Sequence, residues 1–497
     1  MPFWPTVAGS SLLLITATWS LKSRMPGNLW AASFTGGVFL AALLNLQQTR
    51  RIPVIWEILP PREAELTIKV NRLYPKLEEN EASGIGKIVE TADHLPNLRN
   101  HAVYFSTETA EESIARGQIL QLKGVLSYLP AKDSRSLFEE YLSDQSISLT
   151  LTRADIQAPP VNGNPLEQLV GRLRAKAIRV LGTGIEKYQE PLSIYRGMML
   201  GLKGGLSTEN KKLFLQTGTL HLFAISGLHV GIIAVTLAGI FTVLRIPKIP
   251  SAIVGLILVY LYVEMTGASP SAVRAFAMTA FFWLGTSLVR QMPPFQALVA
   301  SAVVVLLLSP NQLFSAGFQL SYTVVAGILT WGLPLYQTLR DRHQARILEK
   351  QQHQTFGLKL YHKGWEAIVG TLCVSLSATL ASAPLSILYF GILAPLAVFL
   401  NILLVPLASL VIISGVFSLL FGFLHLAVIS AFFNHGPLLL ISFTKYLLDG
   451  AVKIPGAFLH MSWKQEAMGN LVAILFIAST LTAHGLKARM FWRFGIP

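Results

Sequence analysis

Apolar residues dominate this chain and come in runs long enough to cross a lipid bilayer. A membrane-spanning helix needs about 20 predominantly apolar residues. Counting the runs predicts a polytopic α-helical membrane protein with roughly 11 transmembrane helices. The runs lie at 6–21, 29–46, 219–244, 251–266, 272–289, 294–309, 313–334, 365–390, 394–424, 425–448 and 467–484.

The composition agrees with this pattern. Hydrophobic residues make up 52% of the 497 residues and charged residues only 13%, whereas soluble domains carry about 25% charged residues. The first apolar run lacks a basic segment before it and a small-residue cleavage site, so no cleavable signal peptide is expected. The single cysteine, Cys373, excludes an intrachain disulfide.

One long segment, 53–160, has the composition of a soluble domain. Short runs rich in β-forming residues, separated by polar breaks, predict a small inserted antiparallel β-domain, with a barrel of the OB type as the expected form. OB folds can bind single-stranded nucleic acid through aromatic side chains and a basic groove. Here residues 51–160 contain 12 basic and 16 acidic residues. This balance favours a packing or gating role, and nucleic-acid binding stays the alternative.

A basic segment, 161–218, follows. Asn164-Pro165 predicts a helix start, with Asn at the N-cap and Pro at the first helical position, and Ser207 predicts the start of a second helix. Leucines and other apolar residues recur from Leu166 at helical spacing, so the first helix should lie in the membrane interface. Its basic residues either hold anionic lipid or form a positive collar that attracts a polyanion. They are Arg172, Arg174, Lys176 and Arg179.

The basic turns between the runs predict the topology. Lys22 and Arg24, the loop 336–363 and the C-terminal residues fall on one side, which the positive-inside rule assigns to the cytoplasm. The N-terminus and the β-domain are then extracytoplasmic. Four parts follow from these assignments: an N-terminal transmembrane hairpin (1–52), the β-domain (53–160), membrane-proximal basic amphipathic helices (161–218) and a multispan domain (219–497).

The apolar run after Thr219 contains unexpected polar residues. His221 and His229 are eight residues apart, about 80° around a helix, and no carboxylate lies near them in sequence, so they make a poor metal pair. Ser226 and His229 could touch on a helix, but no Asp or Glu nearby in sequence orients the histidine for hydrolysis. Gly227 and Gly231 have the spacing of close helix packing. Packing and pore lining is favoured, with a gate or a catalytic pair as alternatives.

Further polar residues lie inside later runs. Glu264 and Arg274 are expected either to form an ion pair or to line a pathway in which Arg274 meets the substrate. Gln319 and Tyr322 belong to a polar patch in the run 313–334 and are candidates for pore lining or gating. No metal ligand cluster and no cofactor motif is predicted.

Several sequence blocks resemble the ComEC/Rec2 competence family in order and spacing, and the block His221–Val230 is the most specific. The region 53–158 also resembles the external OB-like domain of that family. The other blocks are Arg196-Gly197, Gly204–Ser207, Thr217–Leu222, Thr266–Ala275 and Gly317–Ser321.

The resemblance implies a multispan channel that carries one DNA strand across the bacterial inner membrane during natural transformation. Many members add a C-terminal metallo-β-lactamase-like nuclease domain. This sequence ends at Pro497 without a ligand cluster of that type, so no enzymatic activity is expected. The implied partners are single-stranded DNA, anionic lipid, an external DNA receptor and a cytoplasmic DNA motor, and self-association is left open. The alternatives are an intramembrane hydrolase using Ser226 and His229, and a transporter of a smaller anionic solute.

Overall fold

The computed structural model describes most of the chain between residues 60 and 461. Its internal gaps are 75–81, 92–97, 108–113, 115, 131–133, 135, 145–146, 162, 203–206, 220–224, 289–292, 309–311, 314, 350–355 and 455–458. The chain divides into two compact units, one of residues 1–173 with 299–315 and the other of 174–298 with 316–497.

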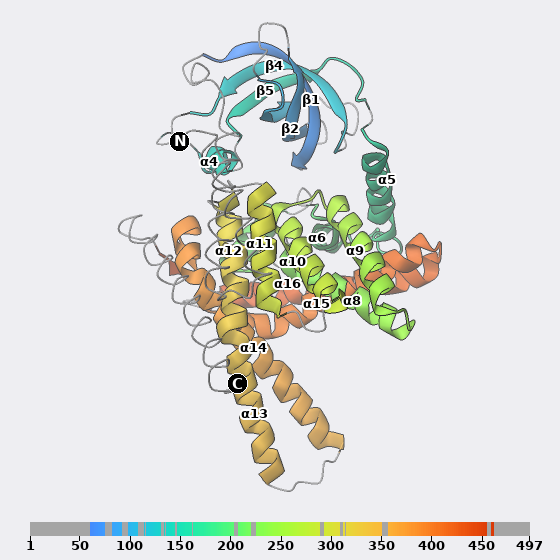
Figure 1. Ribbon diagram of the computed structural model, residues 1–497, viewed down its shortest axis with the longest axis vertical. Helices are drawn as coiled ribbons and strands as arrows, with labels where there is room; N and C mark the ends of the chain where they lie inside the picture. Colours follow the sequence, from blue (N-terminus) through green and yellow to red (C-terminus); the bar gives the residue numbers. More distant parts are fainter. Residues whose placement is uncertain are drawn as a thin grey trace, which may run out of the picture. The chain divides into compact units, whose positions relative to one another are not determined.

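The first unit contains a closed five-stranded barrel (Figure 1). The strand order around the barrel is β1-β2-β3-β5-β4, and β3 pairs with β5 in parallel while the other pairs are antiparallel. The predicted β-domain is therefore confirmed. Its strands are β1 (Arg62–Tyr74), β2 (Ala82–Thr91), β3 (Ala102–Thr107), β4 (Ile119–Tyr128) and β5 (Leu149–Ile156).

Alternating side chains build the barrel core. Leu66, Ile68 and Val70 of β1 are buried while the residues between them are more accessible, as the two-residue period of a strand requires. Small residues permit close approach on β2, since a Cβ at Gly84 would lie 2.2 Å from the carbonyl oxygen of Arg72. The barrel is thus held by an apolar interior with glycine where strands crowd together.

Helix α5 (Pro165–Val180) begins where the sequence predicted. The backbone N–H of Asn164 donates to Oε2 of Glu167 over 2.9 Å, and Oε1 of Glu167 pairs with Nζ of Lys69 on the barrel at 2.9 Å. The carboxylate of Glu167 therefore accepts from a backbone N–H at the start of α5 and also links this helix to β1.

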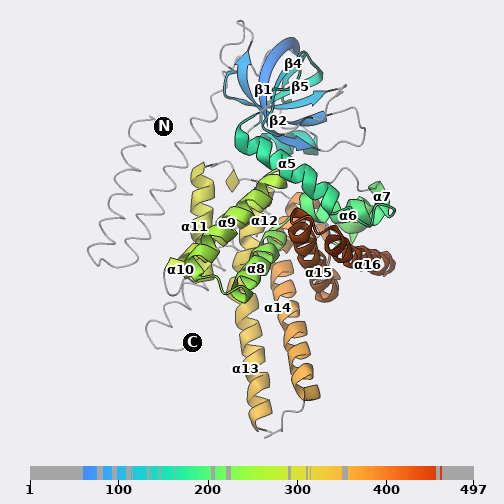
Figure 2. The same ribbon diagram turned by 90° about the vertical axis from the view of Figure 1, so that its right-hand side faces the viewer.

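The second unit is helical (Figure 2). The connection from 161 to 218 is helical as expected, and the amide N–H of Asn210 donates to Oγ of the predicted N-cap Ser207 over 3.2 Å. The helices are α6 (Gln189–Leu200), α7 (Thr208–Gln216), α8 (Gly227–Val243), α9 (Lys248–Met265), α10 (Pro270–Leu288), α12 (Ala316–Gly327), α13 (Leu333–Glu349), α14 (Phe356–Phe390), α15 (Ala397–Phe423) and α16 (Ala427–Val452). Helix α11 (Pro294–Leu308) belongs to both units, and a π-helical turn, η5 (Ile328–Gly332), joins α12 to α13.

Five helices of the described residues are long and apolar enough to span a membrane, instead of the roughly 11 predicted. Helices α8 and α11 have 17 and 15 residues, or about 26 and 23 Å at 1.5 Å per residue, which is short of a core of about 30 Å. Helix α10 is long enough, but Arg274 and four Ser or Thr residues lower its hydropathy. The five are Lys248–Met265, Ala316–Ile347, Leu360–Phe390, Ala397–Phe423 and Ala427–Val452. The predicted runs 6–21, 29–46 and 467–484 lie outside the described residues.

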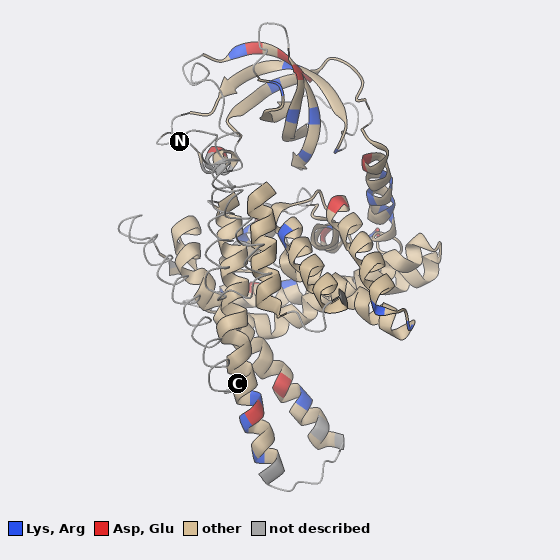
Figure 3. Cartoon of the chain, viewed as in Figure 1, with Lys and Arg blue, Asp and Glu red and all other residues tan. Residues whose placement is uncertain are grey.

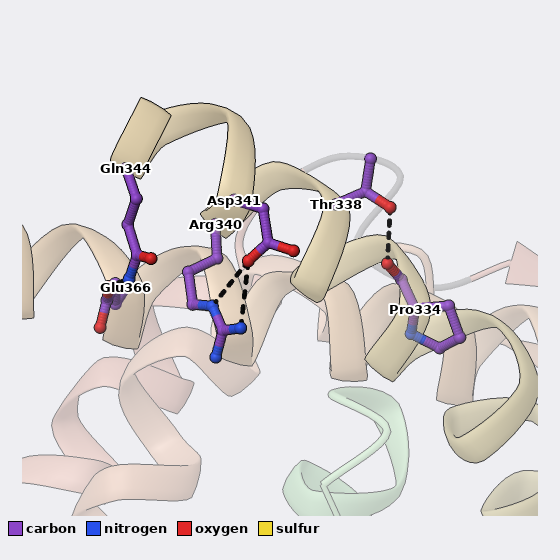
Figure 4. Close-up of polar contacts among 6 residues, drawn as sticks. All are labelled: Pro334, Thr338, Arg340, Asp341, Gln344 and Glu366. Atoms are coloured by element: carbon purple, nitrogen blue, oxygen red, sulfur yellow. Dashed lines mark hydrogen bonds and ion pairs between the residues drawn. The ribbon is translucent and has the colours of Figure 1, made fainter. Parts of the chain in front are cut away.

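The charged residues of α13 and α14 gather in the halves next to the connection between them (Figure 3). Nε and Nη2 of Arg340 both donate to Oδ1 of Asp341, over 3.2 and 3.1 Å, and the amide of Gln344 donates to Glu366 over 3.2 Å (Figure 4). The polar loop predicted at 336–363 is therefore the charged end of a helical hairpin.

Many buried hydroxyls and amides of the helical unit find partners inside the protein. Many hydroxyls donate to the carbonyl four residues earlier, as Thr236 does to Ile232 over 2.8 Å. The most connected group is Asn434 of α16, which is 0% exposed. Its Nδ2 donates to the carbonyls of Val180 (2.8 Å) and Thr183 (3.0 Å), and its Oδ1 accepts from the hydroxyl of Tyr195 over 3.3 Å. One side chain thus joins α16 to the end of α5 and to α6.

We predict that Asn434→Ala lowers the free energy of unfolding by about 2–4 kcal/mol, because it removes three hydrogen bonds from a fully buried site. Thermal unfolding of the purified protein in detergent measures the change. Ser442→Ala in the same helix is the control, since that exposed hydroxyl only contacts its own helix. Equal melting temperatures for the two variants would contradict the role of Asn434.

Candidate transport site

Four sequence blocks that are far apart in the chain meet at helix ends in the second unit. A Cβ at Gly227, the first residue of α8, would lie 3.7 Å from the Cβ of Ala275 near the start of α10. Arg274, the neighbour of Ala275, reaches Gly317 in the first turn of α12. Gly201 ends α6 with φ of +72°, and a Cβ there would lie 3.3 Å from Cγ1 of Ile225. The N-terminal ends of α8, α10 and α12 therefore lie close together.

The pair Ser226 and His229 forms the predicted contact. Ser226 is the N-cap of α8, with extended backbone, and its Oγ lies 3.0 Å from Nδ1 of the fully buried His229. Helix α8 begins at Gly227, so His229 lies in its first turn, and the spacing of about 80° from His221 stays a prediction. His221 lies outside the described residues.

The predicted ion pair between Glu264 and Arg274 is also wrong. Arg274 is 3% exposed, and its Nη2 donates to the carbonyl of Gly317 over 2.8 Å. Its Nε and Nη1 are buried without a hydrogen-bond partner among the described residues. Glu264 lies half-buried in the last turn of α9. A neutral backbone carbonyl thus takes the place expected for a carboxylate.

Two further predicted residues lie on α12. Oε1 of Gln319 accepts from the hydroxyl of Tyr389 in α14 over 2.9 Å. The ring of Tyr322 packs on Phe318 at 4.4 Å between centroids, and Tyr322 lies within electrostatic range of Arg274. Tyr389 had no role in the sequence prediction, since a tyrosine near the end of an apolar run is typical of the membrane interface.

Close helix packing occurs at other glycines than those expected. A Cβ at Gly231 would meet no described atom within 4 Å, and at Gly227 it would make ordinary contact. On α15, a Cβ at Gly422 would lie 2.3 Å from Val180 and one at Gly415 would lie 2.6 Å from Met199. Glycine is therefore needed at Gly422 of α15, where α5 approaches it. Three glycines on other elements are similarly crowded, namely Gly255, Gly327 and Gly332.

The four basic collar candidates have different surroundings. Nζ of Lys176 lies 3.4 Å from the carbonyl of Phe423, the last residue of α15, and 3.4 Å from Nε2 of His425. The positive charge of a lysine is favourable here, next to the carbonyl groups at the C-terminal end of a helix. Arg174 is half-buried, while Arg172 and Arg179 are exposed. The two exposed arginines are the collar residues open to a substrate.

Helix α6 is fixed to α16 by charge as well as by Asn434. The carboxylate of Glu190 pairs with Nζ of Lys445 and accepts from the amide of Asn210 over 3.1 Å. These two hydrogen bonds, that of Lys445 first, hold the pKa of Glu190 below its ordinary value. Glu190 and Lys445 also line a hollow of about 220 Å³ together with Ile194, Ile441 and Tyr446.

The described residues contain no group of three or more His, Cys, Asp or Glu placed to hold a metal ion. What the region around Arg274 offers is a buried cation, hydroxyls and amides at helix ends. Such groups bind anions and polar chains.

A family model described as "Competence protein" matches residues 198–485, more than half of the chain. The chain belongs to this family. The match supports the resemblance to ComEC/Rec2 proteins on which the sequence prediction rested, and it contains the starts of α8, α10 and α12.

Three relatives agree with the family assignment in part. ComE operon protein 3 of Bacillus subtilis is 30% identical over 222 residues, which are 45% of this chain and 25% of that protein. An uncharacterized protein of Aquifex aeolicus is 24% identical over 352 residues, 66% of this chain and 75% of the relative. The uncharacterized protein YcaI of Escherichia coli is 29% identical over 167 residues, 32% and 22% of the two chains. This chain thus spans about a quarter of the length of the Bacillus protein. No solved structure matches it significantly.

The lowered pKa of Glu190 gives a pH prediction. A carboxyl whose pKa is lower in the folded state stabilises the fold above its unfolded pKa, and this contribution is lost as the pH falls through the folded value. We therefore expect Glu190→Gln to destabilise the protein by up to about 1 kcal/mol at pH 7, since the pair is partly exposed, and to have a smaller effect below the ordinary value of 4.5.

Thermal unfolding at the two pH values measures this difference. Glu209→Gln, an exposed residue in the first turn of α7, is the control. An equal effect of Glu190→Gln at both pH values would contradict the prediction.

Proposed function

We propose that this protein is a channel of the bacterial inner membrane that takes up single-stranded DNA during natural transformation. The family match over residues 198–485 is the observation that carries the proposal. In the proposed orientation, the N-terminus and the barrel are extracytoplasmic and the charged α13–α14 hairpin is cytoplasmic, as the positive-inside rule favours. The external receptor and the cytoplasmic motor would be separate proteins.

The barrel supports the proposal through its topology. A five-stranded barrel of this order with a parallel β3–β5 pair agrees with the OB type, a fold that often binds single strands. Tyr74, Tyr104 and Phe138 form an aromatic cluster with centroid distances of 5.1–6.4 Å, and the guanidinium of Arg72 lies 5.2 Å from the ring of Tyr74. These features would suit a domain that binds a single strand. Because acidic residues outnumber basic ones in 51–160, we assign this domain a packing or gating role instead.

The polar helix ends support transport without covalent chemistry. Arg274, Gln319 and Tyr322 supply hydrogen-bonding groups within helices that are otherwise apolar. Polar residues of this kind in membrane proteins mark pathways for polar solutes. A strand of DNA needs such a pathway because its phosphates cannot enter a lipid core.

The contact between Ser226 and His229 favours a second candidate, an intramembrane hydrolase. In a serine-hydrolase triad the nucleophile contacts Nε2 and the orienting carboxylate contacts Nδ1. Here the serine is at Nδ1, so the arrangement differs from that template. We rank hydrolysis second for this reason.

Deletion of the gene in a transformable host should abolish uptake of labelled DNA, and the wild-type gene should restore it. Ser226→Ala should retain most of the uptake if the protein is a channel, since no nucleophile is needed. Loss of uptake at unchanged protein levels would favour the hydrolase. Wild-type uptake in the deletion strain would overturn the proposal, and an unchanged uptake with altered transport of a small anion would favour a solute transporter.

The collar predicts a salt-dependent effect. Replacing Arg172 and Arg179 with Glu should reduce DNA uptake most strongly at low salt, because each contact with a phosphate of a single strand steepens the fall of log affinity with log salt concentration by about 0.7. The same replacements at Arg342 and Arg346, two exposed arginines of α13, are the control. An equal loss at every salt concentration would leave only attachment of α5 to lipid.

A further inference from the structure

Arg274 is a buried cation that lacks hydrogen-bond partners among the described residues at part of its guanidinium group. Its side chain is 3% exposed, and two of its three guanidinium nitrogens have no hydrogen-bond partner among the described residues. Burying a charge is strongly unfavourable unless it is paired and hydrogen-bonded. Its single acceptor, the carbonyl of Gly317, is neutral and lies 2.8 Å from Nη2. A residue serving only the fold would be expected to have a carboxylate here.

The neighbouring helix start adds to the positive potential. Gly317 is in the first turn of α12, where backbone N–H groups lack helical acceptors and the helix dipole is positive. A cation at this end of a helix is unfavourable, whereas an anion is favourable. The guanidinium and the helix start therefore reinforce each other as a site for negative charge.

The local sequence is arranged to let the guanidinium reach this turn. A Cβ at position 317 would lie 3.3 Å from Nη2 of Arg274, so glycine allows the close approach to the backbone. The groups around it on α12 are neutral at physiological pH, since Gln319 is an amide and Tyr322 a phenol. A charged ligand would thus meet one cation and neutral donors.

We propose that Arg274 and the first turn of α12 form a binding site for a phosphodiester anion of the transported single strand. The identity of the ligand rests on the proposed function, while the anion site rests on the geometry alone. Nε and Nη1 of Arg274 lie on opposite sides of the guanidinium, so each would donate separately to an oxygen of the strand, and Nη1 would contact the phosphate. Because the side chain is buried, the residues that cover it move aside when the strand enters.

The full-length protein in a maltoside detergent, which carries no phosphate, provides the test. A short oligothymidylate should raise the melting temperature of the wild type, and the same oligomer with an uncharged methylphosphonate backbone should not. Arg274→Gln should weaken oligothymidylate binding about tenfold or more. Arg346→Gln, at an exposed arginine of α13, should bind as the wild type does, and Arg274→Lys should bind with intermediate affinity.

The stability of the free variants separates a ligand site from a structural role. Arg274→Gln should be at least as stable as the wild type without DNA, because it removes a buried charge. A less stable variant that binds DNA normally would overturn the site, as would equal binding of the methylphosphonate oligomer. Stabilisation by phosphatidylglycerol alone would assign the site to lipid and also overturn it. DNA uptake that persists with Arg274→Gln while gene deletion abolishes it would reject this site and leave the channel intact.

Discussion

A polar group inside an apolar helix bundle must find its partner within the protein, and this constraint explains much of the helical unit. Neither lipid nor a packed core offers a hydrogen bond, so an unsatisfied group carries its full cost of desolvation. Asn434 meets the constraint completely, because its amide links two carbonyls and a tyrosine hydroxyl. Many serine and threonine hydroxyls meet it within their own helices, and others, such as Ser414, meet it on a neighbouring helix. The connections between helices follow from where these groups lie.

Arg274 is the contrasting case. It is as deeply buried as the packing residues, yet the described residues give a hydrogen-bond partner to only one of its guanidinium nitrogens. The same constraint that makes Asn434 a structural link makes Arg274 a functional candidate, since a fold gains nothing from an unpaired buried cation. In the function we propose, the anion that such a residue would meet is the phosphate of DNA. Under that proposal, stability and transport depend on different polar residues of one helical unit.

The basic residues of helix α5 also differ from one another in their surroundings. Its sequence has four cations on one helix, and the pattern alone gives them one role. In the structure Lys176 lies at the end of α15, while Arg172 and Arg179 are open to solvent. Glu167, at the start of the same helix, pairs with the barrel. A helix that reads as a uniform interfacial element thus contains anchoring residues and residues free to attract a polyanion.

The amino-acid sequence alone predicts the membrane class, the inserted β-domain and the start of α5 through composition, periodicity and local capping, and it predicts the family through short sequence blocks. It also predicted the contact of Ser226 with His229, which are three residues apart. Three features follow from the folded structure alone: Arg274 contacts Gly317 and not Glu264, Gly422 of α15 packs closely on Val180, and α8 is shorter than its apolar run. These features depend on which helices are neighbours and on where a backbone leaves the helical conformation. Hydropathy contains neither kind of information, since it counts apolar residues without regard to their partners.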